Sequence, residues 1–120
     1  MEELSKIKKF AEERNIKVHM DGARIFNVLC YYKLKPIDLG EYCDSLTICL
    51  SKGLCCPSGS AILGTKEFIK RARKMRKMLG GGLRQVGMLA AAALYSLEHV
   101  YPKIIQRDND LTFYLGERLK

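Results

Sequence analysis

Two short apolar segments that each end beside a charged residue constrain the fold of this chain most. The run Leu46–Leu50 has the length of a buried strand, and Ser51-Lys52-Gly53 follows it directly. Lys17–Met20 is a second short strand, and Asp21 stands at its carboxyl end. Ligands of an open parallel sheet bind outside the carboxyl ends of its strands. The sequence therefore predicts that Asp21 and Lys52 lie on the same edge of a sheet.

The hydrophobic periodicity and the capping residues predict helices around these strands. The first half of the chain is expected to form a helix over Ser5–Arg14, a strand over Lys17–Met20, a helix over Gly22–Tyr32, a short turn over Leu39–Tyr42 and a strand over Ser45–Leu50. The second half is expected to form a strand over Ser60–Leu63, a helix between the N-cap Thr65 and Gly80, a helix over Leu83–Leu97 and a helix opened by Pro102. The inner side of this last helix is expected to carry Ile104, Ile105, Leu111, Tyr114 and Leu115. Because Leu83–Leu97 is almost entirely apolar, we expect this helix to be buried.

This alternation of helices and strands predicts an α/β fold, a partial three-layer domain in which helices cover a mostly parallel sheet. A chain of 120 residues is one domain or a piece of one. Three strands make a thin sheet, so we expect the sheet to be incomplete in this chain or completed by partners.

Composition excludes several classes of protein. Hydrophobic residues make up 48% and charged residues 28%, which are ordinary globular values. No stretch approaches the ~20 apolar residues that span a membrane, and the first residues lack the features of a signal or transit peptide. We therefore expect a cytoplasmic protein without a membrane partner.

Cysteine usage argues against a metal site. The five cysteines include no C-x-x-C pair, and the chain has only two histidines. Paired ligands at a regular spacing, which zinc sites require, are therefore lacking. Reduced thiols in a cytoplasmic protein are the simpler interpretation.

The positive charge is local. The net charge is +8, and residues 66–77 hold seven of the 21 basic residues and one of the 13 acidic ones. The remainder has 14 basic and 12 acidic residues, a net charge of +2. A basic helix is compatible with nucleic-acid binding, but aromatic residues are few and no recognition fold is visible. We therefore do not expect a nucleic-acid partner.

Three motifs carry a resemblance to a known family. They are His19-Met20-Asp21-Gly22-Ala23-Arg24, Ser51-Lys52-Gly53-Leu54 and Gly80-Gly81-Gly82-Leu83-Arg84-Gln85. In this order and at this spacing they resemble the low-specificity threonine aldolases, pyridoxal phosphate enzymes of the aspartate-aminotransferase fold type. The resemblance covers essentially the whole chain but only the middle of the family's usual length. It implies that residues 1–120 form the central-to-C-terminal part of a large domain, without its N-terminal part and the C-terminal small domain.

The resemblance also implies roles for four residues beside the strands. Asp21 would pair with the ring nitrogen of pyridoxal phosphate, Arg24 would reach its phenolic oxygen, Ser51 would help to hold its phosphate, and Lys52 would form a Schiff base with it. Each residue also has an ordinary structural interpretation. Asp21 is placed to cap a helix, Ser51 to bond within a turn, and Arg24 and Lys52 to meet solvent.

Lys77 and Arg84 flank the glycine run Gly80–Gly82. The resemblance implies that this loop reaches the active site of a neighbouring subunit in a homodimer or homotetramer, where both side chains face anionic groups. The alternative is a basic helix end followed by a flexible loop. We expect His19 to be structural and His99 to be a solvated helix end.

By resemblance, the activity is cleavage of a β-hydroxy amino acid, L-threonine or L-allo-threonine, to glycine and acetaldehyde, a step in threonine catabolism and glycine biosynthesis. Another β-eliminating lyase is an alternative, although the Gly80–Gln85 motif favours the aldolase. The chain lacks the family's Gly-Thr phosphate cup, the histidine that stacks on the ring and the arginine that binds the substrate carboxylate. We therefore expect weak or no activity from this polypeptide alone, and a degenerate fragment without activity is a further alternative.

Overall fold

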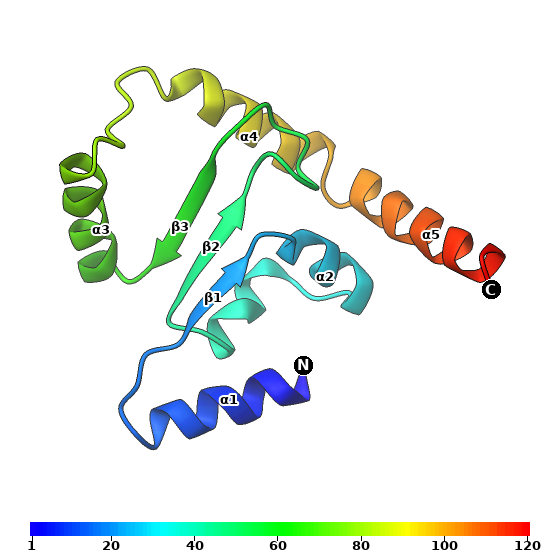
Figure 1. The fold of residues 1–120 in the computed structure, drawn as a ribbon, viewed down its shortest axis with the longest axis horizontal. Helices are drawn as coiled ribbons and strands as arrows, with labels where there is room; N and C mark the ends of the chain where they lie inside the picture. The colour runs from blue at the N-terminus through cyan, green and yellow to red at the C-terminus, as the bar shows by residue number, and fades with distance from the viewer.

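A computed structural model describes all 120 residues (Figure 1). The elements are, in order, α1 (Glu2–Glu12), β1 (His19–Gly22), α2 (Ile25–Tyr32), the short 3-10 helix η1 (Pro36–Glu41), β2 (Ser45–Cys49), β3 (Ser60–Gly64), α3 (Lys66–Met78), α4 (Gly87–His99) and α5 (Lys103–Arg118). The predicted order of helices and strands is confirmed, with shifts of a few residues at the ends. No helix of the chain combines the length and the apolar composition needed to cross a membrane.

The three strands form one sheet in the order β1-β2-β3. β1 pairs with β2 in parallel, with Asp21 opposite Thr47, whereas β2 pairs with β3 antiparallel. The α/β class is confirmed, but the expected mostly parallel sheet is mixed. The connection Leu50–Gly59 explains this difference, because it contains no helix and a parallel crossover needs about a dozen residues or more.

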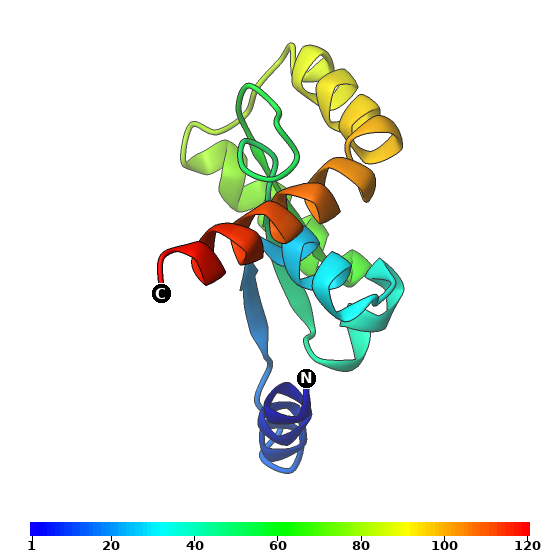
Figure 2. The same cartoon turned by 90° about the vertical axis from the view of Figure 1, so that its right-hand side faces the viewer.

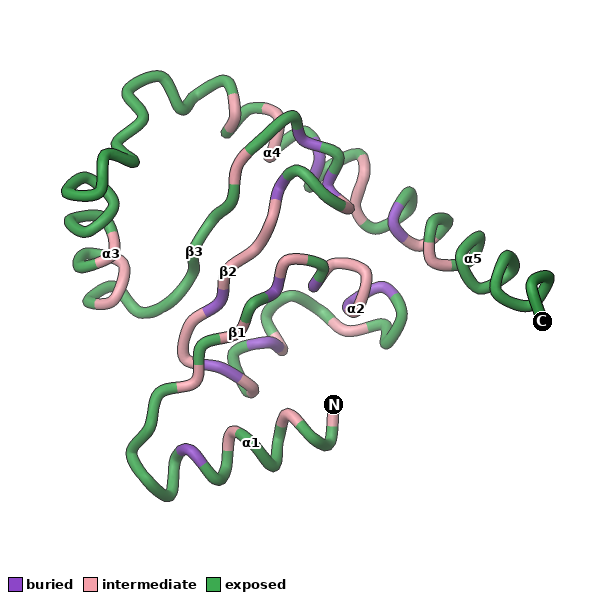
Figure 3. The backbone as a smooth tube through the Cα atoms, in the orientation of Figure 1, coloured by how far each residue is buried: buried purple, intermediate pink, exposed green.

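Helices cover the apolar face of the sheet. One core cluster joins α2, η1 and β2 and consists of Ile25, Leu29, Leu39, Cys43 and Leu46. A second cluster joins α2, α5 and the loop after β2 and consists of Cys30, Leu50, Leu54, Cys56 and Ile105. Figure 2 shows α2 and α4 on the same side of the strands, and Figure 3 shows the buried segments gathered around β2, α2 and the start of α5.

The opposite face of the β1-β2 pair is polar. Successive side chains of a strand point to opposite faces, and the pairing register places His19, Asp21, Thr47 and Cys49 on the face away from Leu46. The ring of His19 lies beside two hydroxyls of β2, with Nδ1 2.9 Å from Ser45 Oγ and Nε2 3.1 Å from Thr47 Oγ1. These contacts fix the orientation of the His19 ring within the chain.

The expectation of a buried helix over Leu83–Leu97 is wrong for this chain. α4 begins at Gly87, and its side chains are largely exposed, with Met88 at 78% and Leu94 at 62%. Only its inner side packs, because Ala92 and Ala93 contact the second core cluster while no other element of the chain covers the outer side.

The predicted inner side of the last helix is also mostly exposed. Ile105 is fully buried, but Ile104, Leu111, Tyr114 and Leu115 are exposed. α5 contacts α2 and then extends beyond the sheet (Figure 1). Its C-terminal turns therefore have nothing within this chain against which to pack.

Candidate active site

Asp21 lies at the carboxyl end of β1, as the sequence predicts. Its Oδ1 accepts a hydrogen bond from the Ala23 amide at 3.1 Å, which closes the turn into α2 in the manner of an Asx-turn. The second carboxylate oxygen has no hydrogen-bond partner within the chain. The side chain is exposed rather than buried, so the carboxylate is available to a ligand.

A short turn holds Lys52 just beyond β2. The Cys55 amide donates to the Lys52 carbonyl at 2.8 Å, and the Cys56 amide donates to the Leu50 carbonyl at 3.0 Å. Gly53 faces α2 closely, because a Cβ added there would lie 3.0 Å from Asn27 Oδ1. The backbone of the turn is therefore fixed on several sides, while the side chain of Lys52 is exposed.

The thiol of Cys49 lies beside one of the predicted residues. Cys49 Sγ lies 3.4 Å from Ser51 Oγ. That hydrogen bond is the largest cause of a lowered pKa of the Cys49 thiol, and the positive charges of Lys52 and Arg24 lower the pKa further. Lys52 and Arg24, which come from different elements, thus both contribute to the electrostatic environment of this thiol.

The positive charges at this edge have no partner within the chain. Neither Lys52 nor Arg24 belongs to any of the chain's ion pairs. Both side chains are exposed. An anionic ligand would therefore find two cations, a hydroxyl and a carboxylate on the carboxyl edge of the parallel pair β1-β2.

Cys49 is a further residue at this edge that the three motifs do not include. The only sequence signal for it is the alternation of β2, which places Thr47 and Cys49 on the polar face. All five cysteines are free thiols in the structure. Nowhere do three or more His, Cys, Asp or Glu side chains gather where they could hold a metal ion.

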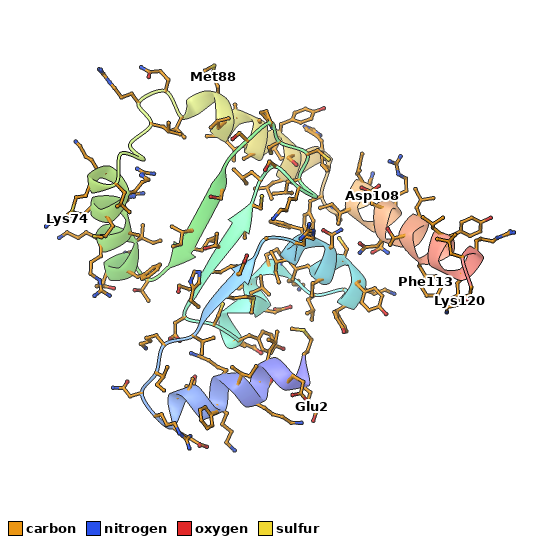
Figure 4. All side chains as sticks on the ribbon, in the orientation of Figure 1. Glu2, Lys74, Met88, Asp108, Phe113 and Lys120 are labelled. Carbon is orange, nitrogen blue, oxygen red and sulfur yellow. The ribbon has the colours of Figure 1, made fainter.

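Within one chain, Lys77 and Arg84 do not lie at this edge. α3 packs against β3, the strand farthest from β1. The connection between α3 and α4 loops away from the sheet, between the labelled side chains of Lys74 and Met88 in Figure 4. Gly80 adopts a φ of 78°, which glycine reaches without strain. Lys77 and Arg84 are both exposed.

The chain is similar to known proteins over its whole length. The beta-eliminating lyase family matches residues 1–120. The low specificity L-threonine aldolase of Escherichia coli O157:H7 is 49% identical over 111 residues, which cover 92% of this chain and 33% of that protein. The low-specificity L-threonine aldolase 1 of Arabidopsis thaliana is 42% identical over 119 residues, 99% of this chain and 33% of that protein. The chain thus spans about a third of the length of these curated relatives.

Two crystal structures share the fold. A candidate L-allo-threonine aldolase from Listeria monocytogenes EGD-E superposes with a TM-score of 0.81 at 25% identity, over 88% of this chain and 29% of that one. A candidate aromatic amino acid beta-eliminating lyase/threonine aldolase from Exiguobacterium sp. 255-15 superposes with a TM-score of 0.77 at 33% identity, over 82% of this chain and 28% of that one. The chain belongs to the beta-eliminating lyase family.

Proposed function

We propose that this chain is the central part of a pyridoxal phosphate-dependent carbon–carbon lyase that cleaves L-threonine or L-allo-threonine to glycine and acetaldehyde. One observation supports the proposal: Asp21 lies at the carboxyl end of β1 and Ser51 and Lys52 follow its parallel neighbour β2, while Arg24 and Lys52 take part in no ion pair. Beta-eliminating lyases and threonine aldolases use pyridoxal phosphate. The names of the relatives support the choice of substrate.

The donor set at this edge fits pyridoxal phosphate. The phosphate of the cofactor matches the hydroxyl of Ser51, and its phenolic oxygen matches the exposed guanidinium of Arg24. Its ring nitrogen matches the carboxylate oxygen of Asp21 that has no partner within the chain. Its aldehyde matches the exposed amine of Lys52. The bound cofactor supplies an electron sink. It accepts the electron pair that remains on the substrate after a bond to the substrate's α-carbon breaks.

The residues of the chain have separate tasks in this proposal. Asp21 would hold a proton at the ring nitrogen, which would keep the ring electron-poor. Lys52 would hold the cofactor covalently through Nζ. Ser51 would bind the phosphate and Arg24 the phenolic oxygen, so that both would orient the cofactor.

We also propose that residues 1–120 correspond to the central-to-C-terminal part of the large domain, and that the protein is a cytoplasmic homo-oligomer. The exposed apolar side chains at the start of α4, with Met88 as the clearest example, support a covered position in an assembly. In that assembly Lys77 and Arg84 would face the anionic groups of a neighbouring subunit's site.

The first test is covalent trapping of the cofactor. The purified chain is mixed with pyridoxal phosphate and reduced with borohydride, and the modified lysines are mapped by mass spectrometry. A single adduct on Lys52 is expected. Lys52→Ala should abolish it, whereas Lys70→Ala, which removes an exposed lysine of α3, should not change it. Adducts scattered over many lysines would contradict the proposal.

The name of the Exiguobacterium structure also allows a β-eliminating lyase as the second candidate. Product analysis separates the two reactions. An aldolase releases acetaldehyde from L-threonine, whereas a β-eliminating lyase releases an aromatic compound from an aromatic amino acid. Lys52 adducts without either product would favour the third candidate, a fragment that binds the cofactor without catalysis.

A further inference from the structure

Ser96 is a buried polar residue in an otherwise apolar part of α4. Its exposed fraction is 3%, and the hydroxyl donates a hydrogen bond to the Leu54 carbonyl, 42 residues earlier in the chain. Residues 89–94 of α4 are all alanine or leucine, so packing alone would not select a hydroxyl at this position. The hydrogen bond to the Leu54 carbonyl is therefore the reason to consider for a hydroxyl at this position.

That partner belongs to the turn that carries Lys52. Leu54 is 1% exposed and packs in the second core cluster. Its neighbour Cys55 donates to the Lys52 carbonyl at 2.8 Å. The turn is therefore tied to itself through Cys55 and to α4 through Ser96, while Lys52 occupies its exposed corner.

We propose that Ser96 is a positioning residue that holds the Lys52 turn in place for the cofactor. This inference rests on the proposed function, because it assigns Lys52 to the cofactor. The Leu54 carbonyl lies in the core, where an acceptor that loses its strong donor is costly. Without the hydroxyl it would keep only the weak thiol donor of Cys56, whose Sγ lies 3.5 Å away. The turn would therefore move until water or a stronger donor reaches that carbonyl, and Lys52 would move with it.

The test compares Ser96→Ala with a control variant that removes a similar hydrogen bond elsewhere. Thr65 caps α3 by accepting a hydrogen bond from the Phe68 amide at 3.3 Å, and α3 packs against β3 rather than against the turn. Thr65→Ala should therefore lower global stability by a similar amount without touching the Lys52 turn. Ser96→Cys keeps a weak donor at the original site.

Two readouts are measured for each variant. The first is amide hydrogen exchange of Cys55 and Cys56 in the cofactor-free chain, with α1 amides as the internal reference. We expect exchange of the two turn amides to accelerate on the order of fivefold in Ser96→Ala, to recover partly in Ser96→Cys and to stay unchanged relative to that reference in Thr65→Ala. The second readout is the pyridoxal phosphate concentration for half-maximal trapping at Lys52, which should rise several-fold only in Ser96→Ala.

The outcomes separate this inference from the proposed function. Unchanged turn amides and unchanged trapping in Ser96→Ala, or equal changes in Thr65→Ala, would overturn the role of Ser96. No trapping at Lys52 in the unaltered chain would overturn the proposed function and the link to the cofactor. In that case the exchange data would still decide whether Ser96 holds the turn.

Discussion

The Cys49 thiol and the Ser51 hydroxyl lie 3.4 Å apart where β2 ends. This hydrogen bond, together with the charges of Lys52 and Arg24, lowers the pKa of Cys49. A lower pKa means that a larger fraction of the thiol is ionised at a pH below the ordinary pKa of cysteine, and the thiolate is the nucleophile. Cys49 therefore reports on the charges that surround the proposed cofactor site.

We predict that Ser51→Ala raises the pKa of Cys49 and slows its alkylation by iodoacetamide at pH 7. Mass spectrometry of timed samples measures the rate, and the exposed thiol of Cys55 in the same molecules serves as the reference. An equal slowing of both thiols would show that the hydroxyl does not act on Cys49 specifically.

Asp44 should make stability depend on acid pH. Its carboxylate accepts hydrogen bonds from Lys8 Nζ at 2.8 Å, the Val18 amide at 2.9 Å and Lys17 Nζ at 3.2 Å. The Lys8 bond, followed by the Val18 bond, holds the pKa of Asp44 well below its ordinary value. Because the pKa is lower in the folded state, the stabilisation is complete above the unfolded pKa of about 4 and is lost as the pH falls toward the folded pKa.

We predict that Asp44→Asn lowers the free energy of unfolding at pH 7 by about 1–2 kcal/mol and flattens the acid limb of its pH dependence. Urea unfolding at several pH values between neutral and acid measures both effects. Glu41→Gln, which removes an exposed carboxyl outside the ion pairs, is the control. An acid limb of unchanged steepness in Asp44→Asn would contradict the assignment.

Cys55 occupies a backbone conformation that favours glycine. Its φ is 56°, in the left-handed region where a Cβ crowds the following carbonyl. We predict that Cys55→Gly stabilises the chain by about 0.5–1 kcal/mol, after allowance for the greater freedom of glycine in the unfolded state. Cys55→Ser, which keeps the Cβ, should not stabilise it. Thermal unfolding of the two variants decides between strain relief and an effect of removing the thiol.

Gly22 allows β1 and β2 to approach closely beside Asp21. A Cβ at this position would lie 2.9 Å from the Thr47 carbonyl oxygen and would also overlap the side chain of Leu46. We predict that Gly22→Ala destabilises the chain by about 1–3 kcal/mol, as measured by urea unfolding. Gly40→Ala is the control, because an added Cβ there meets no atom within 4 Å. Equal costs for the two substitutions would show that crowding at the strands is not the cause.

Local sequence signals predicted much of the secondary structure and the edge that carries the site. Thr65 is an example, because its predicted capping role is confirmed by the bond from the Phe68 amide. Capping and strand alternation depend on neighbours a few residues apart, so they can be read along the chain. The placement of Asp21 and Lys52 at strand ends needs only the strand boundaries and the parallel pairing of β1 with β2.

Contacts between distant segments were beyond such signals. The antiparallel return of β3 depends on the length of one loop, and the exposure of Met88 depends on which other elements are near. The contact of Ser96 with Leu54 joins residues 42 positions apart. No periodicity in the sequence marks a single serine of an apolar helix as the partner of a particular carbonyl.

The order of the elements, the strand ends that carry Asp21 and Lys52, and the motifs can be read along the chain, because backbone preferences and side-chain periodicity act over a few residues. The influence of Arg24 and Lys52 on the Cys49 thiol and the contact of α4 with the Lys52 turn follow from the folded arrangement. Electrostatic and packing interactions fall off with distance in space, whatever the separation along the chain. The chemical environment of Lys52 therefore follows from how α2, β2 and α4 pack together.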